Sequence, residues 1–88
     1  MKATAVGNDT FKIVKKVAYE YFQPGFKITT NTHIKNDLGA DSLEKLDFLI
    51  KIEDEFKRTT PDKQLRKTSK VIETIQNVVD FIEPNLPK

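Results

Sequence analysis

The sequence contains no cysteine, and among its 88 residues there is a single histidine, His33. Without cysteine the chain forms no disulfide and has no thiol chemistry of its own, and a site built from several histidines is also excluded. No apolar run approaches the ~18 residues that cross a bilayer, and the first seven residues are too weakly apolar to predict a secretory signal. The sequence thus favours one small cytoplasmic domain, with little room for a deep catalytic cleft.

Charge is unevenly distributed along the chain, although the net charge is only +2. Residues 37–56 hold seven acids and two bases, so the remainder of the chain is strongly basic. A basic chain suggests nucleic-acid binding, but these bases are scattered and match no known basic motif, which favours solvated surface charges. The compact acidic segment is the more unusual feature and favours contact with a basic partner surface.

Apolar residues recur every three or four positions in several segments, and no segment alternates with a period of two. The fold is therefore predicted to be all-α, a bundle of three main helices plus one short helix. The main helices are expected over residues 9–22, over 42–56 or 42–57, and from after Ser69 to about Ile82, with the short helix after Pro61. The last helix is expected to bury one stripe, made of Val71, Ile72, Ile75, Val78, Val79 and Ile82.

The first expected helix carries signals at both ends. Asn8 or Asp9 can cap it by accepting hydrogen bonds from amides of the first turn. Gln23-Pro24-Gly25 is expected to end it, because proline has no amide hydrogen and glycine accepts a positive φ angle.

Residues 26–41 form a long connection, which is uncommon in a small domain unless it is functional. Three aliphatic residues are spaced along it, Ile28, Ile34 and Leu38. They are expected to pin the connection over the core, with a single turn near residues 32–37.

The second expected helix has two apolar faces when its residues are placed at about 100° intervals. One arc suits the core and consists of Phe48, Leu49, Ile52 and Phe56. A nearly opposite stripe is made of Leu43, Leu46 and Ile50. Acids flank this stripe, namely Asp47, Glu53 and Asp54. Two interpretations stay open: the stripe is an exposed docking site, or the long connection covers it.

Ser42 stands where this helix is expected to begin. Asp41 and Ser42 before an apolar periodic run are a helix-capping signal. A serine nucleophile would need a base within hydrogen-bond reach and an oxyanion hole, and nothing in the spacing ties His33 to Ser42. Catalysis by the chain itself is therefore disfavoured, and a chemically important Ser42 would have to be activated by another protein.

The segment Asp37-Leu38-Gly39-Ala40-Asp41-Ser42-Leu43 resembles the acyl carrier proteins, and the similarity continues through the later helices to cover roughly residues 9–82. The resemblance implies a four-helix carrier domain that is not an enzyme. The expected domain spans residues 9–83, with a flexible N-terminus over 1–8 and a C-terminal tail over 84–88.

The resemblance also implies a cofactor. In this family the motif serine, here Ser42 between Asp41 and Leu43, is joined by a phosphodiester to 4′-phosphopantetheine. A separate phosphopantetheinyl transferase would supply the group from coenzyme A with a magnesium ion. Growing fatty-acyl chains would then be carried as thioesters, so the reactive sulfur missing from the sequence would come with the cofactor.

By the same resemblance, one set of side chains is expected to contact partner enzymes of lipid biosynthesis: Leu43, Glu44, Leu46, Asp47, Ile50, Glu53 and Asp54. Those partners would be acyl-transferring and chain-elongating enzymes with basic docking patches. The expected protein is a monomer, with no nucleic-acid partner and no membrane span.

The chain departs from the family in charge, since members are commonly acidic throughout. Lys45 and Lys51 interrupt the expected recognition helix, and the segment after Pro61 is basic where acids are usual. This indicates a specialised carrier with its own set of partners. Two alternatives stay open: a carrier of aminoacyl, polyketide or peptidyl intermediates, and a helical adaptor that carries nothing.

Overall fold

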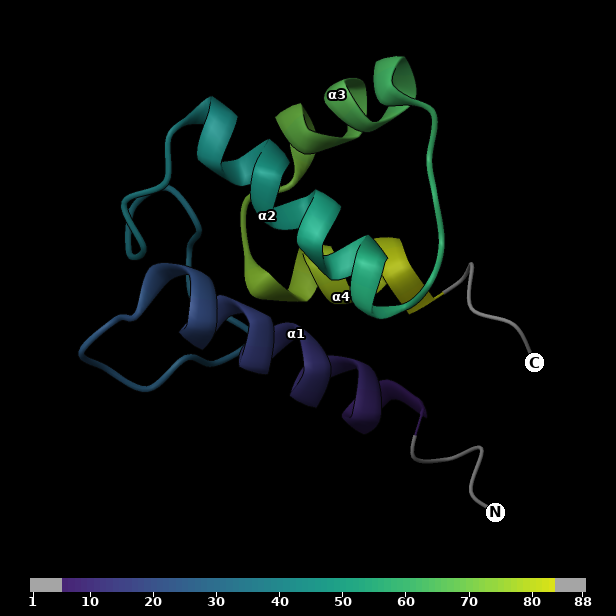
Figure 1. The fold of residues 1–88 in the computed structure, drawn as a ribbon. Coiled ribbons are helices and arrows are strands. Elements are labelled where there is room, and N and C mark those ends of the chain that lie inside the picture. Colours follow the sequence, from purple (N-terminus) through teal and green to yellow (C-terminus); the bar gives the residue numbers. More distant parts are fainter. Residues whose placement is uncertain (1–5, 84–88) are drawn as a thin grey trace.

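The computed structural model describes residues 6–83, which form four α-helices and no strand within that range (Figure 1). The helices are α1 (Val6–Phe22), α2 (Ser42–Glu55), α3 (Asp62–Val71) and α4 (Ile75–Ile82). The prediction of an all-α bundle is confirmed. The predicted tail over 84–88 and the first five residues of the predicted flexible N-terminus lie outside the described residues.

Both ends of α1 differ in detail from the prediction. The helix begins at Val6, so the predicted cap at Asn8 or Asp9 is wrong because both residues lie within the helix. It ends at Phe22, and the positive φ angle of the exit, 48°, falls on Gln23 rather than on Gly25. The Gln23 amide still donates to the Tyr19 carbonyl at 3.0 Å, so the reversal occurs directly at the helix end, before the proline.

The boundary between α3 and α4 lies later than predicted. Ser69 is a buried residue inside α3, and the last helix begins only at Ile75. Thr74 caps α4, since its hydroxyl accepts from the Asn77 amide at 3.2 Å and the Asn77 side chain accepts from the Thr74 amide at 3.0 Å. Val71 was expected in the buried stripe of the last helix, but it ends α3 and is 74% exposed.

Hydrogen bonds attach the long connection between α1 and α2 to the start of α4. The Ile34 amide donates to the Glu73 carbonyl at 2.8 Å. In return, the carbonyls of Thr32 and Thr30 accept from the first two amides of α4 at 3.0 and 2.9 Å. These bonds satisfy amides that a helix N-terminus otherwise leaves without acceptors.

The same connection is also pinned by apolar side chains, as predicted. Ile28 and Ile34 are buried, and Leu38 is half-buried against the core. The Ile28 amide donates to the Tyr19 hydroxyl at 2.8 Å, which ties the connection back to α1.

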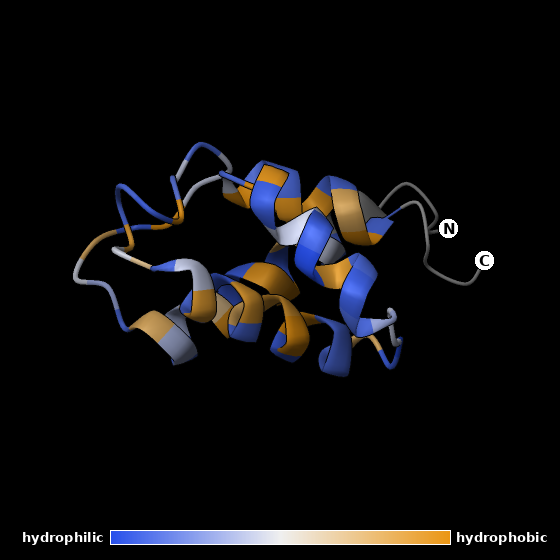
Figure 2. Ribbon diagram, turned by 90° about the horizontal axis from the view of Figure 1, so that it is seen from above, coloured by the Kyte–Doolittle hydropathy of each residue, from blue (hydrophilic) through white to orange (hydrophobic). Residues whose placement is uncertain are grey.

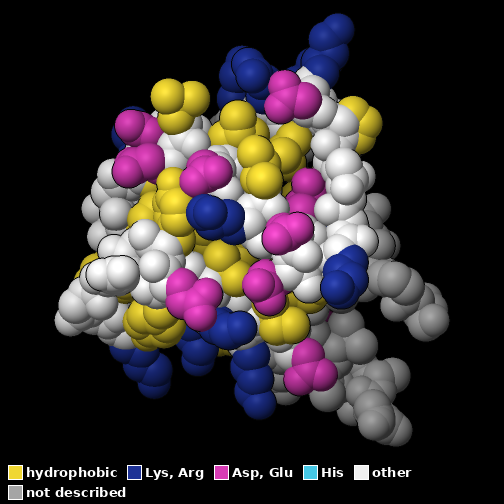
Figure 3. Space-filling model, viewed as in Figure 1, with side chains coloured by type: hydrophobic (Ala, Val, Ile, Leu, Met, Phe, Trp, Pro, Cys, Tyr) yellow, Lys and Arg dark blue, Asp and Glu magenta, His cyan; other side chains and the backbone are white. Residues whose placement is uncertain are grey.

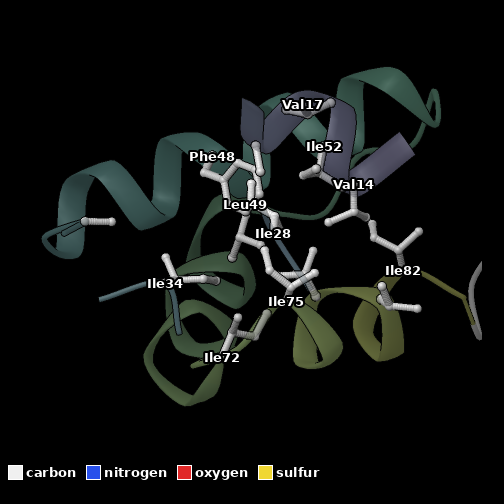
Figure 4. Close-up of a cluster of buried hydrophobic side chains, with 14 of the residues drawn as sticks. Val14, Val17, Ile28, Ile34, Phe48, Leu49, Ile52, Ile72, Ile75 and Ile82 are labelled. Atoms are coloured by element: carbon white, nitrogen blue, oxygen red, sulfur yellow. The ribbon is translucent and has the colours of Figure 1, made fainter. Parts of the chain in front are cut away.

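The core lies between α1, α2 and α4, and α3 packs against α2 (Figures 1 and 4). In the view from above, hydrophobic segments of the helices alternate with hydrophilic ones (Figure 2). The largest fully buried side chains include Phe48, Ile28, Ile34, Leu49, Ile52, Ile75 and Ile82. Burial of each is worth roughly 1.5–3 kcal/mol. No helix in the described part of the chain has the length and hydrophobicity that spanning a bilayer requires.

A buried ion pair fastens the connection between α2 and α3. Nε of Arg58 lies 3.2 Å from Oε2 of Glu53, and the Thr60 hydroxyl also donates to the Glu53 carboxylate. The Arg58 guanidinium lies 4.5 Å from the centre of the Phe81 ring and donates to the Phe81 carbonyl at 3.3 Å. One arginine thus joins the end of α2 to α4.

Replacing Arg58 by methionine should lower the free energy of unfolding by about 2–4 kcal/mol, because the Glu53 carboxylate would stay buried without its cation. Urea unfolding followed by circular dichroism measures this. Arg66→Met is the matched control, since the Arg66–Asp62 pair at 2.9 Å is exposed and should be worth less than about 0.5 kcal/mol. Equal losses in the two variants would contradict a structural role for the buried pair.

Candidate functional site

Burial of one side of α2 determines which side chains the helix presents to solvent. Phe48, Leu49 and Ile52 are buried, as predicted for the core arc. The Phe48 ring lies 5.2 Å from the Phe22 ring and 6.3 Å from the Tyr21 ring, centre to centre. Because the inner face of α2 is held against α1 in this way, its first turn and its opposite face point away from the core.

Ser42 is the first residue of α2, and its side chain is exposed. Among the described residues, none forms a hydrogen bond or ion pair with the Ser42 hydroxyl. His33 is engaged elsewhere, since its Nδ1 accepts from the Asn36 amide at 3.1 Å. Within residues 6–83, the structure therefore places no base in contact with the Ser42 hydroxyl.

The residue that caps α2 is Asp41, which settles the choice between Asp41 and Ser42. The Asp41 carboxylate accepts from the Glu44 amide at 2.8 Å, and the Glu44 carboxylate accepts from the Asp41 amide at 3.0 Å. This reciprocal pair is a capping box. It leaves the Ser42 hydroxyl uninvolved and the amides of Ser42 and Leu43 without acceptors among the described residues.

The second apolar stripe of α2 is mostly open to solvent. Leu43 is 76% exposed and Ile50 is 46% exposed. Leu46 is half-buried and packs against the core. Of the two interpretations of this stripe, the structure supports exposure over cover by the long connection, with Leu46 as its partly covered member.

The acids around this stripe do not share one environment. Glu44 and Asp54 are exposed, and Asp47 is half-buried. Acidic side chains are spread over the front of the molecule, while lysines and arginines gather along its upper and lower edges (Figure 3). In Figure 1, which has the same orientation, α2 lies at the front and α3 at the top.

Glu53 was expected to contact partner enzymes, and its position in the structure does not fit that role. Its carboxylate is buried, paired with Arg58 and bonded by Thr60, so it is not presented to a partner. Unpairing a buried carboxylate is costly. Glu53 therefore belongs to the structural network that holds the α2–α3 connection.

Tyr21 of α1 is a site residue that the sequence pattern did not reveal. Desolvation raises the pKa of Tyr21 to about 12, helped by a hydrogen bond to the Asp47 carboxylate and by the charges of Asp47, Glu44 and Asp41. The Lys51 ammonium lies 5.6 Å from the centre of the Tyr21 ring. No sequence motif indicates that the Tyr21 hydroxyl reaches Asp47.

Lys45 also has a role that its charge alone did not suggest. Its ammonium donates to the Ile72 carbonyl at 2.8 Å. This bond satisfies a carbonyl just past the end of α3 and joins it to the first turns of α2.

Two open clefts flank the exposed face of α2. One lies toward α1 and is lined in part by Tyr21, Lys51 and Asp54. The other lies toward the α2–α3 connection and is lined in part by Ile50, Asp54 and Leu65. Both clefts are bordered by the same three residues of α2, Asp47, Lys51 and Asp54. This part of α2 therefore projects between the two clefts. Within the described residues, no group of three or more His, Asp or Glu side chains could hold a metal ion.

Removal of the Tyr21 hydroxyl should have a pH-dependent effect on stability. Its pKa is higher in the folded chain, about 12, than the ordinary value of 10.0, so neutral Tyr21 stabilises the fold below pH 10 and this contribution is lost as the pH rises toward 12. The difference in unfolding free energy between the wild type and Tyr21→Phe should therefore shrink between pH 10 and pH 12. Urea unfolding across this range measures it, and a constant difference would contradict the raised pKa of Tyr21.

Comparison with known proteins gives the family. No protein-family model matches the chain. The chain is 32% identical over 75 residues to the acyl carrier protein of two strains of Porphyromonas gingivalis, an alignment that covers 85% of this chain and 91% of theirs. It is 39% identical over 56 residues to the acyl carrier protein of Lactobacillus acidophilus, covering 64% of this chain and 65% of that protein.

The similarity to the Porphyromonas proteins extends over nearly their whole length, and the structure has the all-α bundle that the resemblance implies. Members of the family carry acyl groups for other enzymes. The chain belongs to the acyl carrier protein family, and it is a carrier rather than an enzyme.

Proposed function

We propose that this protein carries fatty-acyl or related acyl chains as thioesters on a 4′-phosphopantetheine group attached to Ser42. The observation that carries the proposal is the exposed, unbonded Ser42 hydroxyl on the first turn of α2, next to a cap formed by other residues. The name shared by the relatives supports the carrier role.

The surroundings of Ser42 suit a phosphodiester. The amides of Ser42 and Leu43 have no acceptor among the described residues, and they point out of the N-terminus of a 14-residue helix. Amides and the positive end of the helix dipole favour a phosphate group at this position. Asp41 and Glu44 bond each other's amides, so the two acids beside the site are held in place. When attached, the group supplies the thiol that this cysteine-free chain lacks.

We expect a separate phosphopantetheinyl transferase to attach the group, because no base within residues 6–83 contacts the Ser42 hydroxyl. The Ser42 oxygen would form a new bond to the phosphorus that carries pantetheine, and the phosphoanhydride bond of coenzyme A would break. Adenosine 3′,5′-bisphosphate would leave, and the hydroxyl proton would pass to the transferase. We place this work in the cytoplasm and expect the carrier to act as a monomer.

The exposed face of α2 is the proposed contact surface for partner enzymes. It combines apolar Leu43 and Ile50 with the acids Glu44, Asp47 and Asp54. Apolar groups surrounded by like charges suit a partner with an apolar spot inside a basic patch. Mass spectrometry of the thioester-bound species from the host would separate fatty-acyl cargo from aminoacyl, polyketide or peptidyl cargo.

Incubation with coenzyme A, magnesium and the host's phosphopantetheinyl transferase should add one phosphopantetheinyl group to the wild type and none to Ser42→Ala. Intact-mass analysis gives the result. Ser69→Ala is the matched control, because Ser69 is buried in α3 and its hydroxyl already donates to the Arg66 carbonyl at 2.9 Å. Modification that persists in Ser42→Ala would overturn the assignment to Ser42, and a wild type that stays unmodified would leave the adaptor alternative standing.

Substitution of lysine for Asp47 should slow association with the transferase by about fivefold at low salt, because acids at an interface act mainly on the association rate. Stopped-flow kinetics at low and high salt measure this, and the effect should fade as salt rises. Asp80→Lys, on the exposed side of α4, makes the same change in net charge away from α2. The docking surface is wrongly placed if both variants slow association equally.

A further inference from the structure

The proposed function leaves unexplained the outer face of α3, which is basic along its whole length. Four bases lie on it, Lys63, Arg66, Lys67 and Lys70, and all are exposed. At about 100° per residue they fall within an arc of roughly 100°. Leu65 and Ser69, the buried residues of this helix, lie on the opposite side.

We propose that the outer face of α3 binds an anionic lipid surface, with Lys63, Lys67 and Lys70 over the headgroups and Val71 at the edge of the bilayer. α3 has ten residues and is therefore about 15 Å long. Basic side chains lie at the top of the molecule (Figure 3), where Figure 1 places α3, with an acidic side chain beside them. In the view from above, α3 is nearest to the viewer and is coloured as hydrophilic along most of its length (Figure 2).

The chemistry of this face fits lipid headgroups better than a nucleic acid. α3 carries no aromatic side chain on which a base could stack. Its one arginine, Arg66, is paired with Asp62 through Nε at 2.9 Å, so most of the basic charge of this face is lysine ammonium, which has no planar fork for bidentate contact with base edges. Val71 is 74% exposed and lies about 40° from Lys67 around the helix. Lysines beside a single apolar side chain are suited to a mobile layer of anionic headgroups over hydrocarbon.

The exposed lysines of α1 do not form an equivalent surface. Lys12 and Lys16 are one turn apart, and the same line along the helix holds acids at both ends, Asp9 and Glu20. An acid within one turn of each lysine reduces the positive potential at distances comparable to the screening length. α3 has one acid, Asp62, and Arg66 already pairs with it.

Binding of α3 to the lipid surface would also hold the start of α2 close to that surface. The Lys45 ammonium, in the first turns of α2, is 2.8 Å from the Ile72 carbonyl, directly after Val71. Ser42 and Val71 therefore lie at the same end of the two helices. The inference goes beyond the proposed function, because α3 would bind lipid whether or not Ser42 is modified.

The test is co-sedimentation of the full chain with vesicles of equimolar phosphatidylglycerol and phosphatidylcholine, against vesicles of phosphatidylcholine alone. Binding is expected only to the anionic vesicles, and it should fall steeply as salt rises. Each lysine near such a surface contributes roughly fivefold. The triple variant K63E/K67E/K70E should therefore weaken binding by about 100-fold or more.

Two further variants make the result specific. K12E/K16E/K27E reverses three other exposed lysines and, despite the same net charge, should lose only a small part of the binding. K63Q/K67Q/K70Q removes the charges without adding acids and should also bind weakly, with an unchanged circular dichroism spectrum. The α3 variants should lose vesicle binding whether or not Ser42 carries the phosphopantetheinyl group. The result is therefore independent of the transferase test on Ser42.

Three outcomes would overturn the inference. The first is no binding of the wild type to anionic vesicles. The second is equal loss in K63E/K67E/K70E and K12E/K16E/K27E, which would show an effect of net charge alone. The third is α3-dependent binding to a DNA duplex in the absence of vesicle binding, which would assign this face of α3 to a nucleic acid.

Discussion

The constraint on which the rest of the structure depends is the orientation of α2 about its own axis, which decides which of its side chains face the core. Phe48, Leu49 and Ile52 are buried together, and a helix that buries one arc must expose the arc opposite to it. Leu43 and Ile50 are exposed for this reason, and Ser42 begins the helix where its hydroxyl meets solvent. The proposed contact surface on α2 therefore follows from core packing and needs no rigid pocket of its own.

Two polar networks hold α2 in this position at its opposite ends. At the start, Lys45 joins α2 to the residue after α3, and the pair of Asp41 and Glu44 closes the first turn. At the far end, Arg58 links Glu53 to Phe81 of α4. The first network leaves the Ser42 hydroxyl without a partner among the described residues, whereas the second engages the Glu53 carboxylate with Arg58 and Thr60. Two glutamates of α2 therefore have different roles: Glu44 helps to cap the exposed first turn, and Glu53 is buried in an ion pair.

Much of this arrangement could be predicted from the sequence, because helical periodicity and caps are local. The core arc of α2, the position of Ser42 and the pinning of the long connection by Ile28 and Ile34 agree with the structure. Glu53 could not be placed, since on a helical wheel it falls between the core arc and the outer stripe. Its burial is decided by Arg58, which lies beyond the end of the helix. The predicted start of the last helix after Ser69 is wrong, because the stronger cap, formed by Thr74 and Asn77, lies further along the chain.

The carbonyls of Thr30 and Thr32 have a consequence for the order in which the chain folds. α4 has only eight residues, which is too short for a helix to persist alone in water. Its first two amides find their acceptors in a segment that precedes α2. The last helix is therefore conditional on closure of a loop made much earlier in the chain, and a single backbone cut in that loop would release the C-terminal third of the core as well.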